Sequence, residues 1–164
     1  MLTSLQKANL YLNMFGFSKV PLIWLCRPKI IAIDEKMVEV KIPLRKRTKN
    51  HLNSMYFGAL AVGADVAGGF LAMSKAKNQG EKISLAFKGV KAEFLKRPEA
   101  DVHFVCHDGP LIDQMLAQTM QTMQTGERVN QDVRITALCP TLHGDEPMAE
   151  FDLTLSIKKV TPRA

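Results

Sequence analysis

Asp65 is the residue whose type and position could most directly support chemistry. It carries the only formal charge between Asn50 and Ser74, in an otherwise nearly apolar stretch. A carboxylate in such surroundings must be paired, hydrogen-bonded or protonated, because burial penalises its charged form. No Lys or Arg lies within one helical turn of it. We interpret Asp65 as a general base or nucleophile, and a satisfied core carboxylate is the alternative.

Small residues accompany Asp65 on the predicted helix and indicate open space beside it: Gly58, Ala61, Gly68, Gly69 and Ala72. Gly58 precedes Asp65 by seven residues, so both share one helix face and lie about 10 Å apart along the axis. N–H groups at a helix start can polarise a carbonyl, but one reacting carbon cannot lie about 3 Å from both groups. A site that uses both therefore needs two helices, which predicts a two-fold dimer.

The apolar periodicity predicts the elements that position these groups. The predicted helices cover residues 3–15, ended by Gly16; 55–76, capped by Asn53 or Ser54; and 108–125, capped by Asp108 and ended by Gly126. A short turn or helix is expected over 21–26. The predicted strands cover 30–34, 37–44, 83–95 with a bulge at Gly89, 102–106, 129–138 and 149–160.

Because the strands are grouped rather than alternating with helices, the sequence predicts an α+β fold. We expect a single domain over residues 1–164, in which an antiparallel sheet of about six strands wraps around one long central helix. Residues 1–28 form an N-terminal helical segment packed on it, and a helical insertion lies at about 110–125.

The net charge of +6 comes from 22 basic and 16 acidic residues. Its excess is local, since residues 41–64 hold five basic residues and no acidic one: Lys41, Arg45, Lys46, Arg47 and Lys49. No aromatic residue interleaves these charges and no nucleic-acid-binding signature is present, so no nucleic-acid partner is expected. A clamp for phosphates is one reading and a solvated loop is the other. Lys96 and Arg97 compete for the clamp role.

The cysteines match no metal-ligand spacing. His103 and His107 have the i, i+4 spacing of a ligand pair, but on a strand they would lie roughly 13 Å apart, so neither a metal nor a cofactor is expected. Three widely spaced cysteines indicate free thiols in a reducing, cytoplasmic environment. The apolar run over 55–73 is long enough to span a bilayer, but a central carboxylate costs roughly 3 kcal/mol there. We therefore expect a buried helix and no membrane partner.

The run from Asn50 to Ala59, followed by Ala64 and Asp65, resembles the central-helix signature of the hotdog thioesterases. The likeness is closest to the phenylacetate-pathway-type acyl-CoA thioesterases and to an uncharacterised, thioesterase-like branch. In that signature an Asn lies in the loop, a Gly opens the helix and an acidic residue follows seven positions later. The stretch 94–98 resembles the end of the strand after the helix. The family usually has a His two residues before this Gly, and this chain has Tyr56 at that position.

This resemblance implies a hotdog fold and hydrolysis of an acyl thioester, with coenzyme A as part of the substrate. It implies that Asp65 activates water or attacks the carbonyl, and that the N–H of Gly58 holds the oxyanion. Asn50 would orient the water or carbonyl, Tyr56 would shape that end, and Ser84 would contact the substrate from the next strand. A homodimer or a dimer of dimers is implied. Two alternatives stay open: a non-catalytic acyl-thioester-binding or assembly protein, and an acyl-thioester hydratase or dehydratase.

Overall fold

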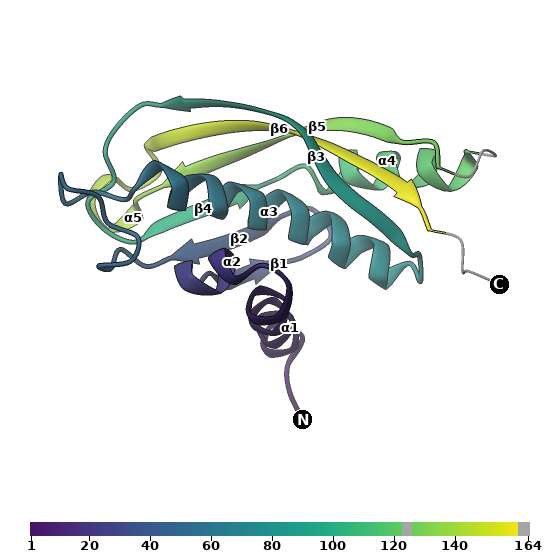
Figure 1. Ribbon diagram of the computed structural model, residues 1–164, viewed down its shortest axis with the longest axis horizontal. Coiled ribbons are helices and arrows are strands. Elements are labelled where there is room, and N and C mark those ends of the chain that lie inside the picture. Colours follow the sequence, from purple (N-terminus) through teal and green to yellow (C-terminus); the bar gives the residue numbers. More distant parts are fainter. Residues whose placement is uncertain (123–125, 161–164) are drawn as a thin grey trace.

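A six-stranded antiparallel sheet curves around one long helix, α3 (Phe57–Asn78), in the computed structural model (Figure 1). The structure describes residues 1–122 and 126–160. The sheet has the order β1-β2-β4-β5-β6-β3. Its strands are β1 (Lys29–Ile33), β2 (Val38–Ile42), β3 (Ile83–Phe94), β4 (Val102–Cys106), β5 (Val129–Leu138) and β6 (Pro147–Lys159). This architecture confirms the predicted α+β class.

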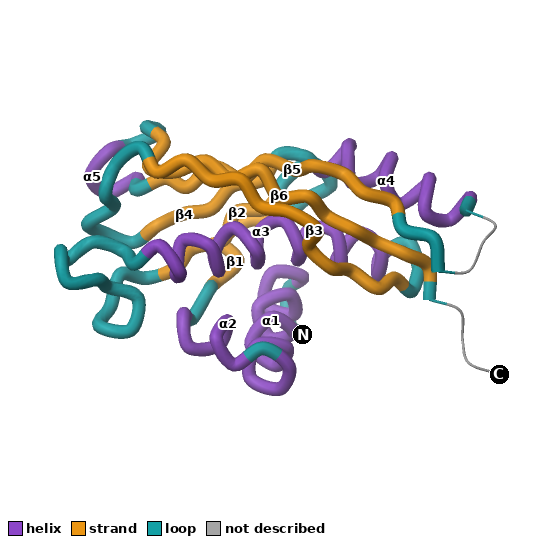
Figure 2. Tube along the Cα trace, turned by 45° about the horizontal axis from the view of Figure 1, so that its top comes forward, coloured by secondary structure: helices purple, strands orange, loops and turns teal. Residues whose placement is uncertain are grey.

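The remaining helices lie around this core. They are α1 (Ser4–Lys19), α2 (Pro21–Cys26), α4 (Gly109–Gln121) and α5 (Pro140–His143). Figures 1 and 2 show α1 and α2 on the side of α3 opposite β5 and β6, with α4 at one end of the sheet. Asn9 ties α1 to β1, because its amide donates to the Ile30 carbonyl at 2.9 Å and accepts the Ile30 N–H at 2.8 Å.

Alternating side chains explain the strands that enclose α3. In β2 the side chains of Val38, Val40 and Ile42 are buried, while Glu39 and Lys41 alternate with them on the other face. β6 follows the same rule over most of its length. The predicted bulge in β3 is confirmed, since the register against β6 shifts between Phe87 and Gly89.

The apolar character of α3 fits a core helix. By length and hydropathy it is the single candidate for a membrane span in the part of the chain that the structure describes. However, 61% of its most apolar 18-residue window is buried inside the domain. The expectation of a buried helix is therefore confirmed.

The predicted boundaries of α1 and α3 are wrong. Gly16 does not end α1, which continues to Lys19. Its missing side chain instead lets α2 approach, because a Cβ atom there would lie 3.0 Å from the backbone nitrogen of Trp24. The central helix begins at Phe57, with Tyr56 as an N-cap that makes no side-chain bond. Asn53 cannot cap it, since this residue adopts a left-handed turn at φ 62°.

The predicted helix over 108–125 is observed as α4, which ends at Gln121. Residues 123–125 lie outside the described residues, and Gly126 adopts a positive φ of 99°. Asp108 occupies the N-cap position, but its carboxylate accepts the backbone N–H of Arg134 at 2.6 Å instead of capping the helix. The four-residue helix α5 is too short to give a periodic pattern in the sequence.

Gly63 offers a test of how closely α3 packs on the sheet. A Cβ atom at Gly63 would lie 2.2 Å from the ring of Phe104, which is fully buried. We expect Gly63→Ala to lower the free energy of unfolding by about 2 kcal/mol, because the ring has no room to retreat. Urea denaturation measures the change.

The matched control is Gly69→Ala in the same helix, where the nearest side-chain atom lies 3.3 Å away on the partly exposed ring of Phe87. Alanine favours the helix over glycine by up to about 1 kcal/mol, so this variant should be neutral or stabilised. Equal destabilisation of both variants would contradict the proposed tight contact of Gly63.

Candidate active site

Asp65 lies in the wall of a pocket of about 340 Å³ between α1, α2, α3 and β3. The side chains that surround it are apolar and come from all four elements: Leu12, Phe15, Ile23, Val66, Leu85 and Phe87 are among them. Besides the Asp65 carboxylate, the lining residues bring one polar side chain, that of Tyr11. A single ionisable carboxylate thus faces an apolar pocket large enough for a small organic group.

The surroundings of Asp65 favour its neutral form. Burial raises the pKa of this carboxyl from 3.8 to about 6. Its side chain makes no hydrogen bond or ion pair with any residue that the structure describes. Gly69 leaves space beside it, because a Cβ atom there would lie 3.7 Å from the carboxylate Oδ1. A carboxylate with this pKa is suited to accept a proton near neutral pH.

The start of α3 presents N–H groups without intramolecular acceptors. Among residues 1–122 and 126–160, the backbone N–H groups of Phe57 and Gly58 have no hydrogen-bond partner, and no side chain caps the helix. The ring of Tyr56 lies over Gly58, since a Cβ atom there would come 2.5 Å from it. Tyr56 is half-exposed. Donors at the positive end of a helix can stabilise a developing oxyanion.

Asn50 shapes the loop that leads into α3. Its Oδ1 accepts the backbone N–H groups of Leu52 at 2.9 Å and Ser54 at 3.2 Å, and its Nδ2 donates to the Ser54 hydroxyl at 3.1 Å. The side chain therefore holds the turn before Gly58, and it does not line the Asp65 pocket.

The basic residues of the loop before α3 are exposed. Arg45, Lys46 and Arg47 make no ion pair with a described residue. Their loop is fixed by Thr48, whose hydroxyl donates to the Pro43 carbonyl at 2.7 Å. The Thr48 carbonyl then accepts the N–H of Tyr56 at 2.8 Å, which joins the loop to the start of α3.

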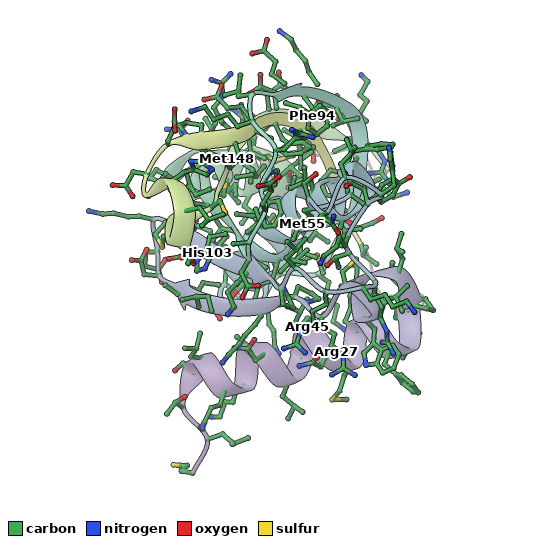
Figure 3. All side chains as sticks on the ribbon, turned by 90° about the vertical axis from the view of Figure 1, so that its left-hand side faces the viewer. Arg27, Arg45, Met55, Phe94, His103 and Met148 are labelled. Atoms are coloured by element: carbon green, nitrogen blue, oxygen red, sulfur yellow. The ribbon has the colours of Figure 1, made fainter. Side chains whose placement is uncertain are left out.

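The second basic pair, Lys96 and Arg97, follows β3 and reaches the same end of the helix. The N–H of Met55 donates to the Pro98 carbonyl at 2.9 Å, so this turn abuts the loop before α3. Lys96 forms an ion pair with Glu146, whereas Arg97 is exposed. Figure 3 looks at this end of the molecule and shows Arg45, Met55 and Phe94 there. Both predicted basic groups thus lie near the Gly58 end.

Ser84 is not brought to the pocket. Leu85 and Phe87 line it, so strand alternation places Ser84 on the opposite face of β3, where its hydroxyl lies 3.4 Å from the Arg128 guanidinium. The small residues that the sequence places beside Asp65 do not all border the pocket. Gly69 borders the pocket, but Gly68 packs beneath the sheet, with the side chain of Ile135 at 3.3 Å from a Cβ atom there.

Sequence reasoning missed the wall that α1 and α2 contribute. The helical spacing of Leu12 and Phe15 in residues 3–15 predicts an apolar face, but a core face and a pocket wall have the same pattern. In the structure these residues, with Val20 and Ile23, close one side of the space beside Asp65. One signal in the sequence was available: residues 3–26 hold more large apolar side chains than a single buried helix face requires.

Comparison with known proteins identifies the fold. Residues 9–155 match the family described as domain of unknown function (DUF4442). A thioesterase from Haemophilus influenzae superimposes with a TM-score of 0.67 at 14% identity, covering 100% of this chain and 97% of that chain. A mutant thioesterase from Pseudomonas aeruginosa gives 0.67 at 15% identity, covering 98% and 97%. A protein of unknown function from Chlorobaculum tepidum gives 0.78 at 14% identity, covering 95% and 97%. A search of curated proteins finds no match.

Proposed function

Since the chain belongs to the DUF4442 family and has the hotdog fold of thioesterases, we propose that it hydrolyses acyl-CoA thioesters. The observation that carries this proposal is the carboxylate of Asp65, which faces an apolar pocket and has no hydrogen-bond or ion-pair partner among residues 1–122 and 126–160. Asp65 is partly buried, and a carboxyl whose pKa is raised by burial in the wall of an apolar pocket is a candidate for a catalytic role.

We further propose that two protomers share each site. Gly58 and Asp65 lie about 10 Å apart on one helix, too far to act on one carbonyl. β3 is an edge strand that exposes Phe87, Val90 and Phe94. The unpaired backbone groups of a long apolar edge strand favour pairing with another strand. The β3 strand of a second copy can pair with them across a two-fold axis. Such a homodimer brings the start of one α3 toward the Asp65 pocket of the other.

The proposed reaction uses groups from both subunits. Asp65 takes a proton from a water molecule, and the resulting hydroxide attacks the thioester carbonyl. The N–H groups of Phe57 and Gly58 of the partner subunit hold the oxyanion. When the C–S bond breaks, Asp65 returns the proton to the leaving thiolate, which yields a carboxylic acid and free coenzyme A. Tyr56 of the partner subunit borders the oxyanion. Asn50 of the partner subunit holds the loop before α3 and so positions the two N–H donors.

The charge and pocket fit the two ends of an acyl-CoA. The exposed guanidinium and ammonium groups of Arg45, Lys46, Arg47 and Arg97 lie near the start of α3 and can bind phosphates. The pocket beside Asp65 takes the acyl group. Because Lys96 is paired with Glu146, we assign it a smaller share of phosphate binding.

A panel of acyl-CoA esters, followed by release of free thiol, tests the function. We expect turnover of at least one ester, with a preference set by the apolar pocket. Loss of the conjugated double bond of a crotonyl ester without thiol release would assign a hydratase instead. Tight binding of esters with neither reaction would assign a non-catalytic binding protein. Either result would overturn the proposal.

The pH dependence of the reaction follows from Asp65. The general base must be ionised, and its pKa is raised to about 6. We therefore expect kcat/KM to fall about tenfold per pH unit below pH 6 and to reach a plateau above about pH 7. Initial rates of thiol release across this range measure the profile. A midpoint near 4, the ordinary value for an aspartate, would mean that Asp65 is solvated during the reaction.

A further inference from the structure

The outward side of α1 and α2 exposes large apolar side chains. Leu10, Met14 and Phe17 follow the spacing i, i+4, i+7, so they form one stripe along α1, opposite the buried Leu12 and Gly16. The short helix α2 adds three more exposed residues, and we call the set of six the outer face: Leu10, Met14, Phe17, Leu22, Trp24 and Leu25. The rings of Phe17 and Trp24 meet edge to face at 5.7 Å, which joins the two helices into one surface.

The outer face is separate from the candidate active site. The residues of α1 that line the Asp65 pocket are Tyr11, Leu12 and Phe15, and none of the six belongs to that lining. It is also distinct from the β3 edge at which we propose dimerisation. Phe17 is 68% exposed, which is unusual for phenylalanine in a soluble surface without a partner.

The charge around the outer face selects its partner. Residues 1–33 contain four basic residues, Lys7, Lys19, Arg27 and Lys29, and no acidic residue. None of the four forms an ion pair with a described residue. The Arg27 guanidinium lies 6.0 Å from the centre of the Trp24 ring, and Figure 3 shows Arg27 on the side of the molecule where α1 and α2 lie. Asp34 and Glu35 line one hollow together with Lys7, so the positive charge beside the outer face comes from Lys19, Arg27 and Lys29 at the ends of α1 and α2. Apolar side chains next to such charge complement a surface that is anionic outside and apolar beneath.

We propose that the outer face docks on the surface of an anionic phospholipid bilayer. The helices would lie in the interface and not cross it, because 16 residues of α1 extend only about 24 Å. The apolar side chains enter the boundary between headgroups and acyl chains, and the basic residues contact the phosphates. The carboxylate of Asp65 disfavours a membrane span through α3, whereas contact through the outer face leaves α3 in the core. The proposal does not depend on thioester hydrolysis.

Vesicle flotation of the full chain tests the proposal. We expect the protein to float with vesicles of phosphatidylcholine and phosphatidylglycerol, and at least about tenfold less with phosphatidylcholine alone. The triple variant Leu10→Gln, Met14→Gln, Phe17→Gln should lose at least about tenfold of the bound fraction, because three apolar anchors are removed. Arg27→Gln, which removes the guanidinium beside Trp24, should lose about fivefold, and high salt should reduce binding of the wild type.

The matched control is Leu142→Gln, which removes an exposed leucine from α5. It should bind vesicles as the wild type does, and circular dichroism checks that every variant is folded. Sedimentation velocity of the triple variant provides the second measurement. Absence of flotation with anionic vesicles, or equal flotation of wild type and triple variant, would overturn the proposal. A smaller oligomer in the triple variant would also overturn it, because a second copy of the chain would then cover the outer face.

Discussion

We expect Asp65→Asn to lower kcat/KM for acyl-CoA hydrolysis about 1000-fold and, at pH 8, to raise the free energy of unfolding by about 2 kcal/mol. Activity falls because asparagine cannot accept the proton of the attacking water. Stability rises because the wild type must keep a charge in an apolar pocket at this pH. Thiol release measures the first effect and urea denaturation the second.

The sign of the stability change depends on pH. Since the pKa of Asp65 is raised from 3.8 to about 6, the folded state binds more protons than the unfolded state between these values. The free energy of unfolding therefore falls as pH rises through this range, and the full penalty is present above pH 6. The rise in pKa corresponds to about 3 kcal/mol. We expect about 2 kcal/mol in the variant, since Asp65 keeps some contact with solvent and the asparagine amide also loses hydrogen bonds to water.

Asp145→Asn is the control for both effects, because Asp145 is exposed and lies outside the pocket. It should change neither activity nor stability. An Asp65→Asn protein with full activity would remove Asp65 from the mechanism. An Asp65→Asn protein that is less stable at pH 8 would show instead that the carboxylate has a structural partner in the assembled protein.

A mixture of two inactive variants is expected to recover about one quarter of the wild-type activity. In Asp65→Asn the base is lost, and Gly58→Pro removes one of the two oxyanion donors, which lowers kcat about 100-fold to 1000-fold. Proline is tolerated near a helix start because the N–H that it removes has no partner in the helix. If subunits exchange randomly, half of the dimers are mixed, and each has one site with both groups intact.

The readout is thiol release after the two variants are denatured and refolded together at equal concentration. Gly58→Ala is the matched control, because its side chain displaces the Tyr56 ring but the N–H remains. It should keep most of the activity. No recovery in a mixture that sedimentation shows to contain dimers would place Gly58 and Asp65 of the same subunit in one site, or remove one of them from the mechanism.

Most elements could be predicted because their signals are local. The alternation of Val38, Val40 and Ile42 indicates a half-buried strand, and the change of phase at Gly89 indicates a bulge. Helix ends were less predictable because they depend on tertiary contacts. Gly16 has the residue type of a helix end, yet it provides room for the backbone of Trp24.

The candidate site was predictable in its central residue but not in its surroundings. A lone carboxylate in an apolar helix identifies Asp65, and its pKa of about 6 agrees with that interpretation. The residues that surround the Asp65 side chain depend on which helices and strands cover that side of α3. Local periodicity in the sequence does not show how these elements pack. The same reason explains Ser84, since one residue of register decides whether a strand side chain faces the pocket or the opposite side.

The helices α1 and α2 carry two different surfaces, the wall of the Asp65 pocket and the outer face. Asn9 joins α1 to β1 through two hydrogen bonds, and Gly16 lets α1 and α2 touch closely, so the two helices form one packed unit. One surface closes the space beside Asp65, and the other is the outer face. The two surfaces are thermodynamically linked if an acyl group shifts the α1–α2 unit when it enters the pocket. Binding of the acyl group then changes the affinity of the outer face for its partner. Docking of that partner changes the affinity for the acyl group by the same factor.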